Sequence, residues 1–213
     1  MNATPAPAPT PAPADATAAP TRRTRVARAV TDGMDPKNVI LLVCLAVGAA
    51  QENVLTGLGW ALEAIVFSAL IPLAYIKRGI KAGDWEDRHV GQRARRMRLI
   101  PVIMASVGAG VALMLWFDAP RQMIALVAAM LATLAVILPI TAAWKVSVHT
   151  AVSAGALAML AVTYGPLTWI AAPLVAVIAW SRVALRDHTL AQTVVGALVG
   201  VAAAGAVFTW VSG

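Results

Sequence analysis

The sequence predicts an all-α membrane protein, a single helix bundle with six to seven transmembrane helices. Of the 213 residues, 60% are hydrophobic and 13% are charged, whereas a soluble domain has roughly 45–50% apolar and about 25% charged residues. The mean hydropathy is +0.76, and the apolar stretches approach the ~20 residues that a membrane-spanning helix needs. This composition excludes an ordinary soluble globule, a disordered chain and a disulfide-stapled secreted domain.

The first 33 residues are predicted to be a disordered N-terminal tail, and residues 34–213 to be the membrane domain. Residues 1–20 alternate Ala and Pro, which favours extended polyproline II. They lack the charged start and apolar core of a signal peptide. A basic stretch follows, and we expect it to contact anionic lipid on the cytoplasmic face; its cations are Arg22, Arg23, Arg25 and Arg28.

Seven apolar stretches, separated by short polar loops, make up the predicted bundle. The first and the sixth are short, so we expect them to be tilted or partly inside the protein. In the last one, Gly196 and Gly200 form a small-xxx-small pair that predicts close helix packing. Tryptophans typical of an interfacial belt lie near the ends: Trp60, Trp116, Trp144, Trp169, Trp180 and Trp210. In chain order, the predicted spans are residues 38–51, 57–76, 99–117, 120–143, 148–164, 166–181 and 189–211.

The loops between seven spans divide unequally between the two sides of the membrane. Loops 77–98, 144–147 and 182–188 lie on the side of the tail, and this side carries all three histidines and every Lys and Arg except Arg121. A positive-inside bias explains the Lys and Arg, but not the histidines. We therefore expect these three loops, which are far apart in the sequence, to meet on one face.

These loops contain residues suited to binding an anion. Lys145, Ser147 and His149 stand at the start of a span, where backbone N–H groups favour an anion and a histidine can donate a proton. A plainer interpretation is that Ser147 only caps the helix. Arg182 precedes His188 by a short interval, and ionisable groups near membrane depth are candidates for function.

The same residues resemble the type 2 phosphatidic acid phosphatase family, the membrane branch of the phosphatase and vanadium haloperoxidase superfamily. The third family motif is Ser-Arg, five residues, His, three residues, Asp; here it reads Ser181-Arg182, His188 and Gln192 at that spacing. The second motif, Pro-Ser-Gly-His, reads Val146-Ser147-Val148-His149. In the first motif, Arg96-Met97 takes the place of Arg-Pro, which puts His89 at the position of the motif Lys.

Motif order and the two-helix gap between the second and third motifs also match the family. The resemblance covers roughly residues 77–205, and the stretch from Lys145 to Gly200 is similar to an actinobacterial subgroup.

The resemblance implies a lipid phosphatase of the cell membrane that uses no metal or other cofactor. His188 would attack phosphorus, His149 would protonate the leaving oxygen, and Gln192 would orient His188 in place of the motif Asp. The substrate would be phosphatidate or a polyprenyl phosphate or diphosphate. Because the cations stand in loops between spans, we expect no nucleic-acid partner. The residues implied to hold the phosphate are Arg182, Ser181, Ser147, Lys145, Arg95, Arg96 and His89.

Two alternatives stay open. A magnesium-dependent membrane transferase would use Asp84, Glu86 and Asp87 as metal ligands. A non-catalytic membrane protein would only bind anionic lipid or a partner. Family active sites usually face away from the cytoplasm, whereas the charge count places these loops inside it, so the sequence leaves the side of the site open.

Overall fold

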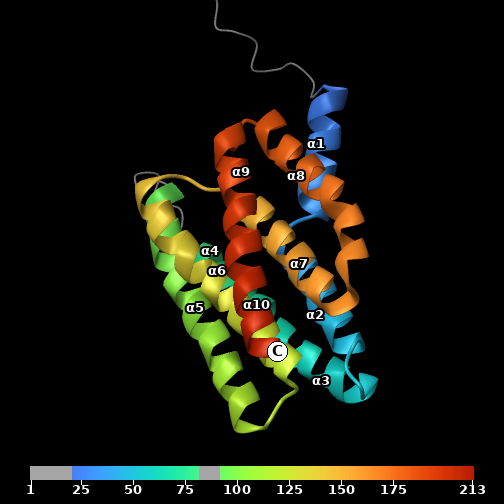
Figure 1. The fold of residues 1–213 in the computed structure, drawn as a ribbon. Coiled ribbons are helices and arrows are strands. Elements are labelled where there is room, and N and C mark those ends of the chain that lie inside the picture. Colours follow the sequence, from blue (N-terminus) through green and yellow to red (C-terminus); the bar gives the residue numbers. More distant parts are fainter. Residues whose placement is uncertain (1–20, 82–91) are drawn as a thin grey trace, which may run out of the picture.

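The structure, a computed structural model, describes residues 21–81 and 92–213, except for the side chains of residues 80 and 92–98. Within these ranges every regular element is a helix (Figure 1). The elements are α1 (Arg22–Gly33), α2 (Pro36–Ala49), α3 (Val54–Ile65), η1 (Val66–Leu70), α4 (Ile71–Lys81), α5 (Gln92–Trp116), α6 (Arg121–Ala143), α7 (Val148–Tyr164), η2 (Pro166–Ala171), α8 (Ala172–Ala184), α9 (Leu190–Val199), η3 (Gly200–Ala204) and α10 (Gly205–Ser212).

Five helices of the described chain are long and apolar enough to cross a membrane. The predicted helical membrane class is therefore supported by the length and composition of the helices. Two further predicted spans, α2 and α7, are shorter apolar helices. The five long helices are Val54–Gly79, Leu99–Trp116, Arg121–Ala143, Pro166–Ala184 and Leu190–Ser212.

The prediction that the first and sixth spans are short is confirmed for the first, α2, and wrong for the sixth. The predicted sixth span is not short, because η2 and α8 together run over Pro166–Ala184. The second short helix is α7, which is the central one: it contacts α2, α6, α8, α9 and α10. It includes seven consecutive buried positions, from Ser153 to Met159. A helix surrounded by protein has less need to match the bilayer thickness than one surrounded by lipid.

Two of the long helices contain a π-helical segment. In the first, Pro72 lacks the N–H that would bond to the carbonyl of Ser68, and the chain widens into η1 just before it. The Ser106 hydroxyl of α5 donates to the Phe67 carbonyl at 2.6 Å and so satisfies an acceptor within this segment. In the second, η3 packs on α7 through small residues.

A seam of small residues brings α7 and the last span together. A Cβ atom on Gly200 would lie 2.0 Å from the Ala151 carbonyl oxygen, and one on Gly196 would lie 2.5 Å from the Ser147 carbonyl oxygen. Both distances are shorter than any real contact, so only glycine fits at either position. The close packing predicted for this pair is confirmed. We call Ala151, Gly155, Gly196, Gly200 and Ala204 the glycine seam.

Part of the predicted tail is a helix. Residues 22–33, which we expected to be disordered, form α1, capped by the Thr21 hydroxyl, which accepts from the Thr24 N–H at 3.2 Å. This helix packs against α8 with Ala27 and Thr31 buried, while its four arginines are exposed. The arginine-rich composition suggested disorder, but the small side chains of α1 form a narrow face that α8 covers. Residues 1–20 lie outside the described part.

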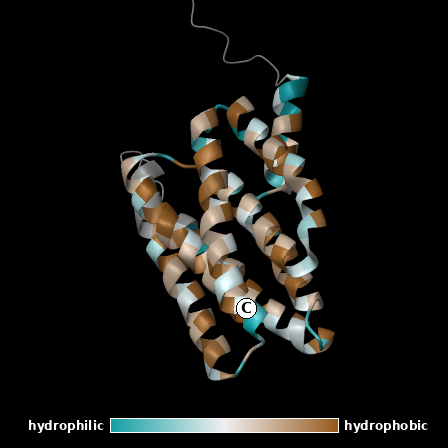
Figure 2. Cartoon of the chain, viewed as in Figure 1, coloured by the Kyte–Doolittle hydropathy of each residue, from teal (hydrophilic) through white to brown (hydrophobic). Residues whose placement is uncertain are grey.

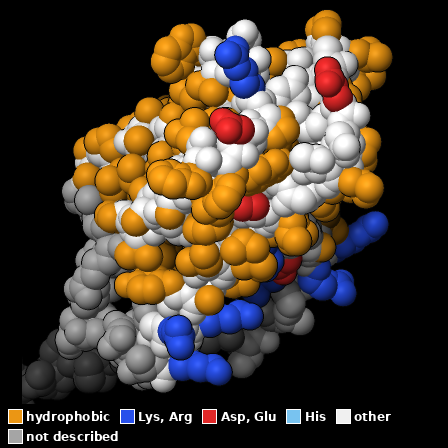
Figure 3. Space-filling model, turned by 90° about the horizontal axis from the view of Figure 1, so that it is seen from below, with side chains coloured by type: hydrophobic (Ala, Val, Ile, Leu, Met, Phe, Trp, Pro, Cys, Tyr) orange, Lys and Arg blue, Asp and Glu red, His pale blue; other side chains and the backbone are white. Residues whose placement is uncertain are grey.

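The polar residues gather at one end of the bundle. Figure 2 shows hydrophilic colour on α1 and on the loops at the upper end, with apolar residues along the helices below. Figure 3 looks at the lower end, where hydrophobic side chains cover most of the surface. The buried core lies between these ends and is formed chiefly by α2, α3, α6 and α7.

Candidate functional site

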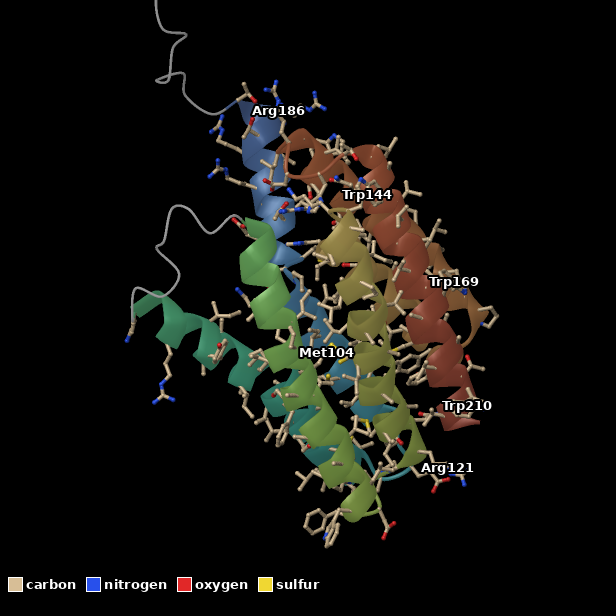
Figure 4. The ribbon with its side chains drawn as sticks, turned by 90° about the vertical axis from the view of Figure 1, so that its left-hand side faces the viewer. Met104, Arg121, Trp144, Trp169, Arg186 and Trp210 are labelled. Carbon is tan, nitrogen blue, oxygen red and sulfur yellow. The ribbon has the colours of Figure 1, made fainter. Side chains whose placement is uncertain are left out.

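Two of the three predicted loops meet at the upper end of the bundle. The Ser147 N–H, before α7, donates to the Gln192 carbonyl at 3.1 Å, and the Lys145 ammonium donates to the Asp187 carbonyl. In Figure 4, Trp144 and Arg186 mark these two loops at the same end, and Arg121 lies at the other end. The predicted convergence of loops 144–147 and 182–188 is thus confirmed.

The start of α7 is fixed by a helix cap and by close packing against α9. Ser147 is its N-cap and is fully buried, with its hydroxyl accepting from the Thr150 N–H at 3.5 Å. Gly196 of α9 lies directly against this turn, because a Cβ there would meet the Ser147 carbonyl and the Thr150 hydroxyl. The helix N-terminus therefore has a fixed position relative to α9, as a site built from both helices requires.

His149 carries a buried ring nitrogen that has no hydrogen-bond partner among the described residues, its Nε2 atom. The charged groups whose electric field reaches its ring are Arg182, Asp35, Asp187 and Asp32. The ring is thus surrounded by the α8–α9 loop on one side and by the corner between α1 and α2 on another. Buried polar atoms are normally paired, so a ligand atom would complete this environment.

Arg182 is the cation at the centre of the cluster. Its Nη2 atom forms an ion pair with the Asp187 carboxylate at 3.0 Å, and its side chain is 12% exposed. Its Nε–H group is buried without a partner among the described residues. The guanidinium therefore keeps a donor available while one of its ends is anchored.

The α8–α9 loop is folded back onto the end of α8. The N–H groups of Asp187 and His188 both donate to the Arg182 carbonyl, at 3.1 and 3.3 Å. Arg186 makes the reversal possible by adopting the left-handed region, with φ of 58°, which is uncommon for a residue other than glycine. His188 is consequently held close to Arg182 and is 8% exposed.

Gln192 acts as part of a helix cap. Its side-chain oxygen accepts from the Thr189 N–H at 3.1 Å, and the Thr189 hydroxyl accepts from the Gln192 N–H at 3.3 Å. This reciprocal pair is a capping box. The amide oxygen that we expected to orient His188 is therefore engaged by the backbone of the neighbouring residue, and the orienting role stays a prediction.

Ser181 faces away from the loops, toward α1. It is fully buried, and its hydroxyl donates to the Ile178 carbonyl at 2.8 Å and lies 3.0 Å from the Thr31 hydroxyl. A direct contact with phosphate would require these bonds to break. The remaining candidates were not located: His89 lies outside the described residues, and Arg95 and Arg96 stand in the first turn of α5, where side chains are not described.

An apolar cavity of about 340 Å³ lies inside the bundle, and its lining includes Val148, the residue before His149, but none of the candidate site residues that the structure describes. Its walls come from α2, η1, α4, α5, α6, α7 and η3, and the charged residues in its lining are Asp35 and Lys37. Sequence reasoning missed this feature, because the residues that enclose it are generic apolar ones. The one local signal was Asp35-Pro36, a cap followed by a first-turn proline, which starts α2 at the rim of the cavity.

The magnesium alternative is not decided by this geometry. No group of three or more His, Cys, Asp or Glu side chains that could hold a metal occurs in the described ranges. Asp84, Glu86 and Asp87, on which that alternative depends, lie outside them.

Comparison of the chain with protein-family models, with curated proteins and with solved structures finds no match in any of the three. The family resemblance therefore depends on the motif residues alone.

Proposed function

We propose that this protein is an integral membrane lipid phosphatase. It hydrolyses the phosphate monoester or diphosphate of a lipid, phosphatidate or a polyprenyl phosphate or diphosphate, through a phosphohistidine intermediate. The observation that carries the proposal is the buried pair Arg182 and His188, which lies in the same bundle as an apolar cavity whose lining includes Val148, the residue before His149. Such an arrangement suits an amphiphile whose head is anionic and whose tail is hydrocarbon.

The chemistry assigns one role to each polar group. An imidazole nitrogen of His188 attacks phosphorus, and the bond from phosphorus to the lipid oxygen breaks as the new P–N bond forms. His149 gives its proton to the departing lipid oxygen. Water then cleaves the P–N bond and releases inorganic phosphate. Arg182 and Lys145 stabilise the charge on the phosphoryl oxygens, which is the main task of a phosphoryl-transfer site.

The proposed enzyme is a multi-pass protein of the cell membrane with six to seven spans. The five long helices account for most of them, and α2 and α7 would supply the remainder. With seven spans, the cluster and the start of α1 lie on the same side of the membrane. Since the cavity lies among helices whose outer faces would contact the acyl chains, we propose that a lipid enters from the bilayer.

The test is phosphate release by the purified protein in detergent with EDTA present. The substrates are phosphatidate, undecaprenyl phosphate and undecaprenyl diphosphate. We expect His188→Ala to abolish release, because no other group replaces the nucleophile. Arg182→Ala should lower kcat by about 100-fold, since it removes a donor to the developing charge. Arg121→Ala, which removes an arginine at the opposite end, is the matched control and should leave release unchanged.

Other outcomes point to the alternatives. Release that requires magnesium and disappears with EDTA would support the metal-dependent transferase or hydrolase. Absence of release from every substrate by folded protein would overturn the proposal and favour a membrane protein that only binds anionic lipid. Equal release by wild type and His188→Ala would exclude the phosphohistidine.

A further inference from the structure

The N-terminal helix packs against the helix that carries Arg182. It precedes the motif-bearing part of the chain, yet it packs along α8, whose last turn contains Ser181 and Arg182. Two side chains of α1 are buried in this contact, Ala27 and Thr31, and they are one helical turn apart on the same face. The last turn of α1 therefore lies beside the residue that precedes Arg182.

One hydrogen-bond chain connects the two helices. Ser181 has a single hydroxyl proton, and it is donated to the Ile178 carbonyl at 2.8 Å. The Ser181 oxygen can then only accept in the 3.0 Å contact with the Thr31 hydroxyl. The chain thus runs from the Thr31 hydroxyl to the Ser181 oxygen and from the Ser181 proton to Ile178. Both serine and threonine are buried, so water does not compete for these bonds.

These hydrogen bonds lie next to Arg182 and help to fix its position. The arginine follows Ser181 directly, its side chain is mostly buried, and its Nη2 atom is tied to Asp187 at 3.0 Å. Anchoring the backbone of α8 at Ser181 fixes the starting point of the guanidinium, and the ion pair fixes its end. Asp32, the neighbour of Thr31, and Asp35, the cap of α2, act electrostatically on His149 from the same corner.

We propose that Thr31 is a positioning residue for Arg182, acting through the hydroxyl of Ser181. It contacts no substrate. Its hydroxyl keeps the last turn of α8 in the register that presents the guanidinium to a phosphate group. This inference builds on the proposed function in one respect, that the ligand of Arg182 is a phosphate group.

Two substitutions separate a positioning role from simple packing. Thr31→Val keeps the shape of the side chain but removes the donor, and Thr31→Ser keeps the donor but removes a methyl group. If Thr31 acts through its hydrogen bond, Thr31→Val weakens phosphate binding about fivefold, the effect of losing one neutral hydrogen bond. Thr31→Ser should then restore wild-type affinity. Packing alone would give the opposite order, because the serine variant leaves the larger void.

The test uses the full chain in detergent and two readouts. The first is the affinity for inorganic phosphate, measured from the rise in unfolding temperature with phosphate concentration. The second is kcat/KM for lipid phosphate hydrolysis. Both are measured for wild type, Thr31→Val, Thr31→Ser and Arg182→Lys, and for Thr31→Val combined with Arg182→Lys.

The double variant shows whether Thr31 acts through Arg182. We expect the fivefold effect of Thr31→Val to vanish in the Arg182→Lys background, because residues that act as one unit are not additive. An equal effect of Thr31→Val in both backgrounds overturns the inference, and so does wild-type behaviour of Thr31→Val.

The two proposals can fail separately. If wild type binds phosphate but hydrolyses no lipid phosphate, the proposed function fails and the inference is judged on phosphate affinity alone. If hydrolysis occurs while free phosphate binds too weakly to measure, the inference about Thr31 is judged on kcat/KM. If wild type neither binds phosphate nor hydrolyses any of the lipids, both are overturned.

Discussion

The two sides of α7 are packed by opposite means. Toward α9 and η3 it meets the glycine seam, where backbones approach so closely that a single methyl group would not fit. Toward α2, α4, α5 and α6 it borders a cavity of about 340 Å³, and the seam residues Ala151, Gly155 and Ala204 form the part of the cavity wall where the two sides meet. Protein interiors contain few voids larger than a water molecule. An apolar space of this size is therefore unusual, and it lies beside one of the closest helix contacts in the structure.

The close contact fixes the positions of the site residues, and the cavity leaves space for a ligand. Ser147 and His149 begin α7, Gln192 lies in the first turn of α9, and the seam keeps these two helix starts in fixed register. The cavity beside this seam is an unfilled space with mostly apolar walls. A site that performs chemistry on the head of a lipid needs a rigid frame for the head and space for the tail.

The largest expected effect is at the seam. Gly200→Ala places a Cβ atom 2.0 Å from the Ala151 carbonyl oxygen, so α7 and the last span must move apart. We expect at least about 3 kcal/mol of destabilisation, at the upper end of the cost of overpacking. The measurement is the unfolding temperature of the purified protein in detergent.

Gly59→Ala is the matched control for that substitution. Gly59 lies within α3, and nothing is within 4 Å of the position where its Cβ would be built. Alanine there should be neutral or stabilise the protein by up to about 1 kcal/mol, through its higher helix propensity. Equal destabilisation by both variants would show that the seam is not closer packed than the surface of α3.

An intermediate effect is expected from filling the cavity. Val152 lines it from α7, and Val152→Phe would place a ring where a lipid chain is proposed to lie. We expect kcat/KM for a long-chain lipid phosphate to fall about tenfold, while hydrolysis of a small soluble phosphate ester stays unchanged. A loss of about 1.4 kcal/mol of binding corresponds to that factor.

Leu198→Phe serves as the outward-facing control. Leu198 is 64% exposed on α9, so a larger apolar side chain there should change neither substrate. If Val152→Phe lowers the hydrolysis of long and short substrates equally, the cavity is not the site of the chain.

The smallest effect is expected at Glu63 of α3, which lies outside both the seam and the cavity lining. Both carboxylate oxygens of this α3 residue are buried and have no hydrogen-bond partner among the described residues. Glu63→Gln replaces the ionisable carboxyl group by a neutral amide of the same shape. Charged groups in a membrane interior are costly. We expect the unfolding temperature to rise by no more than a few degrees, with activity unchanged. Glu52→Gln, in the exposed α2–α3 loop, is the control, and a clear loss of stability in Glu63→Gln alone would reveal a partner for the carboxylate.

The sequence by itself determined the helical membrane class, the polar loops at one end and the close packing of a helix at Gly196 and Gly200. These features follow from properties that each residue carries locally: hydropathy, charge, and the absence of a side chain. The motif spacing also brought Lys145, Ser147, His149, Arg182 and His188 to attention before any geometry was known.

Only the tertiary structure decided which neighbours these residues have. It turned part of the expected tail into α1, because α8 covers the small side chains of Ala27 and Thr31. It also directed Ser181 toward Thr31 and Gln192 into a helix cap, and it left a cavity beside α7. A hydrogen-bond partner, a covered face and an unfilled volume each depend on a second segment distant in the chain, which no local pattern specifies.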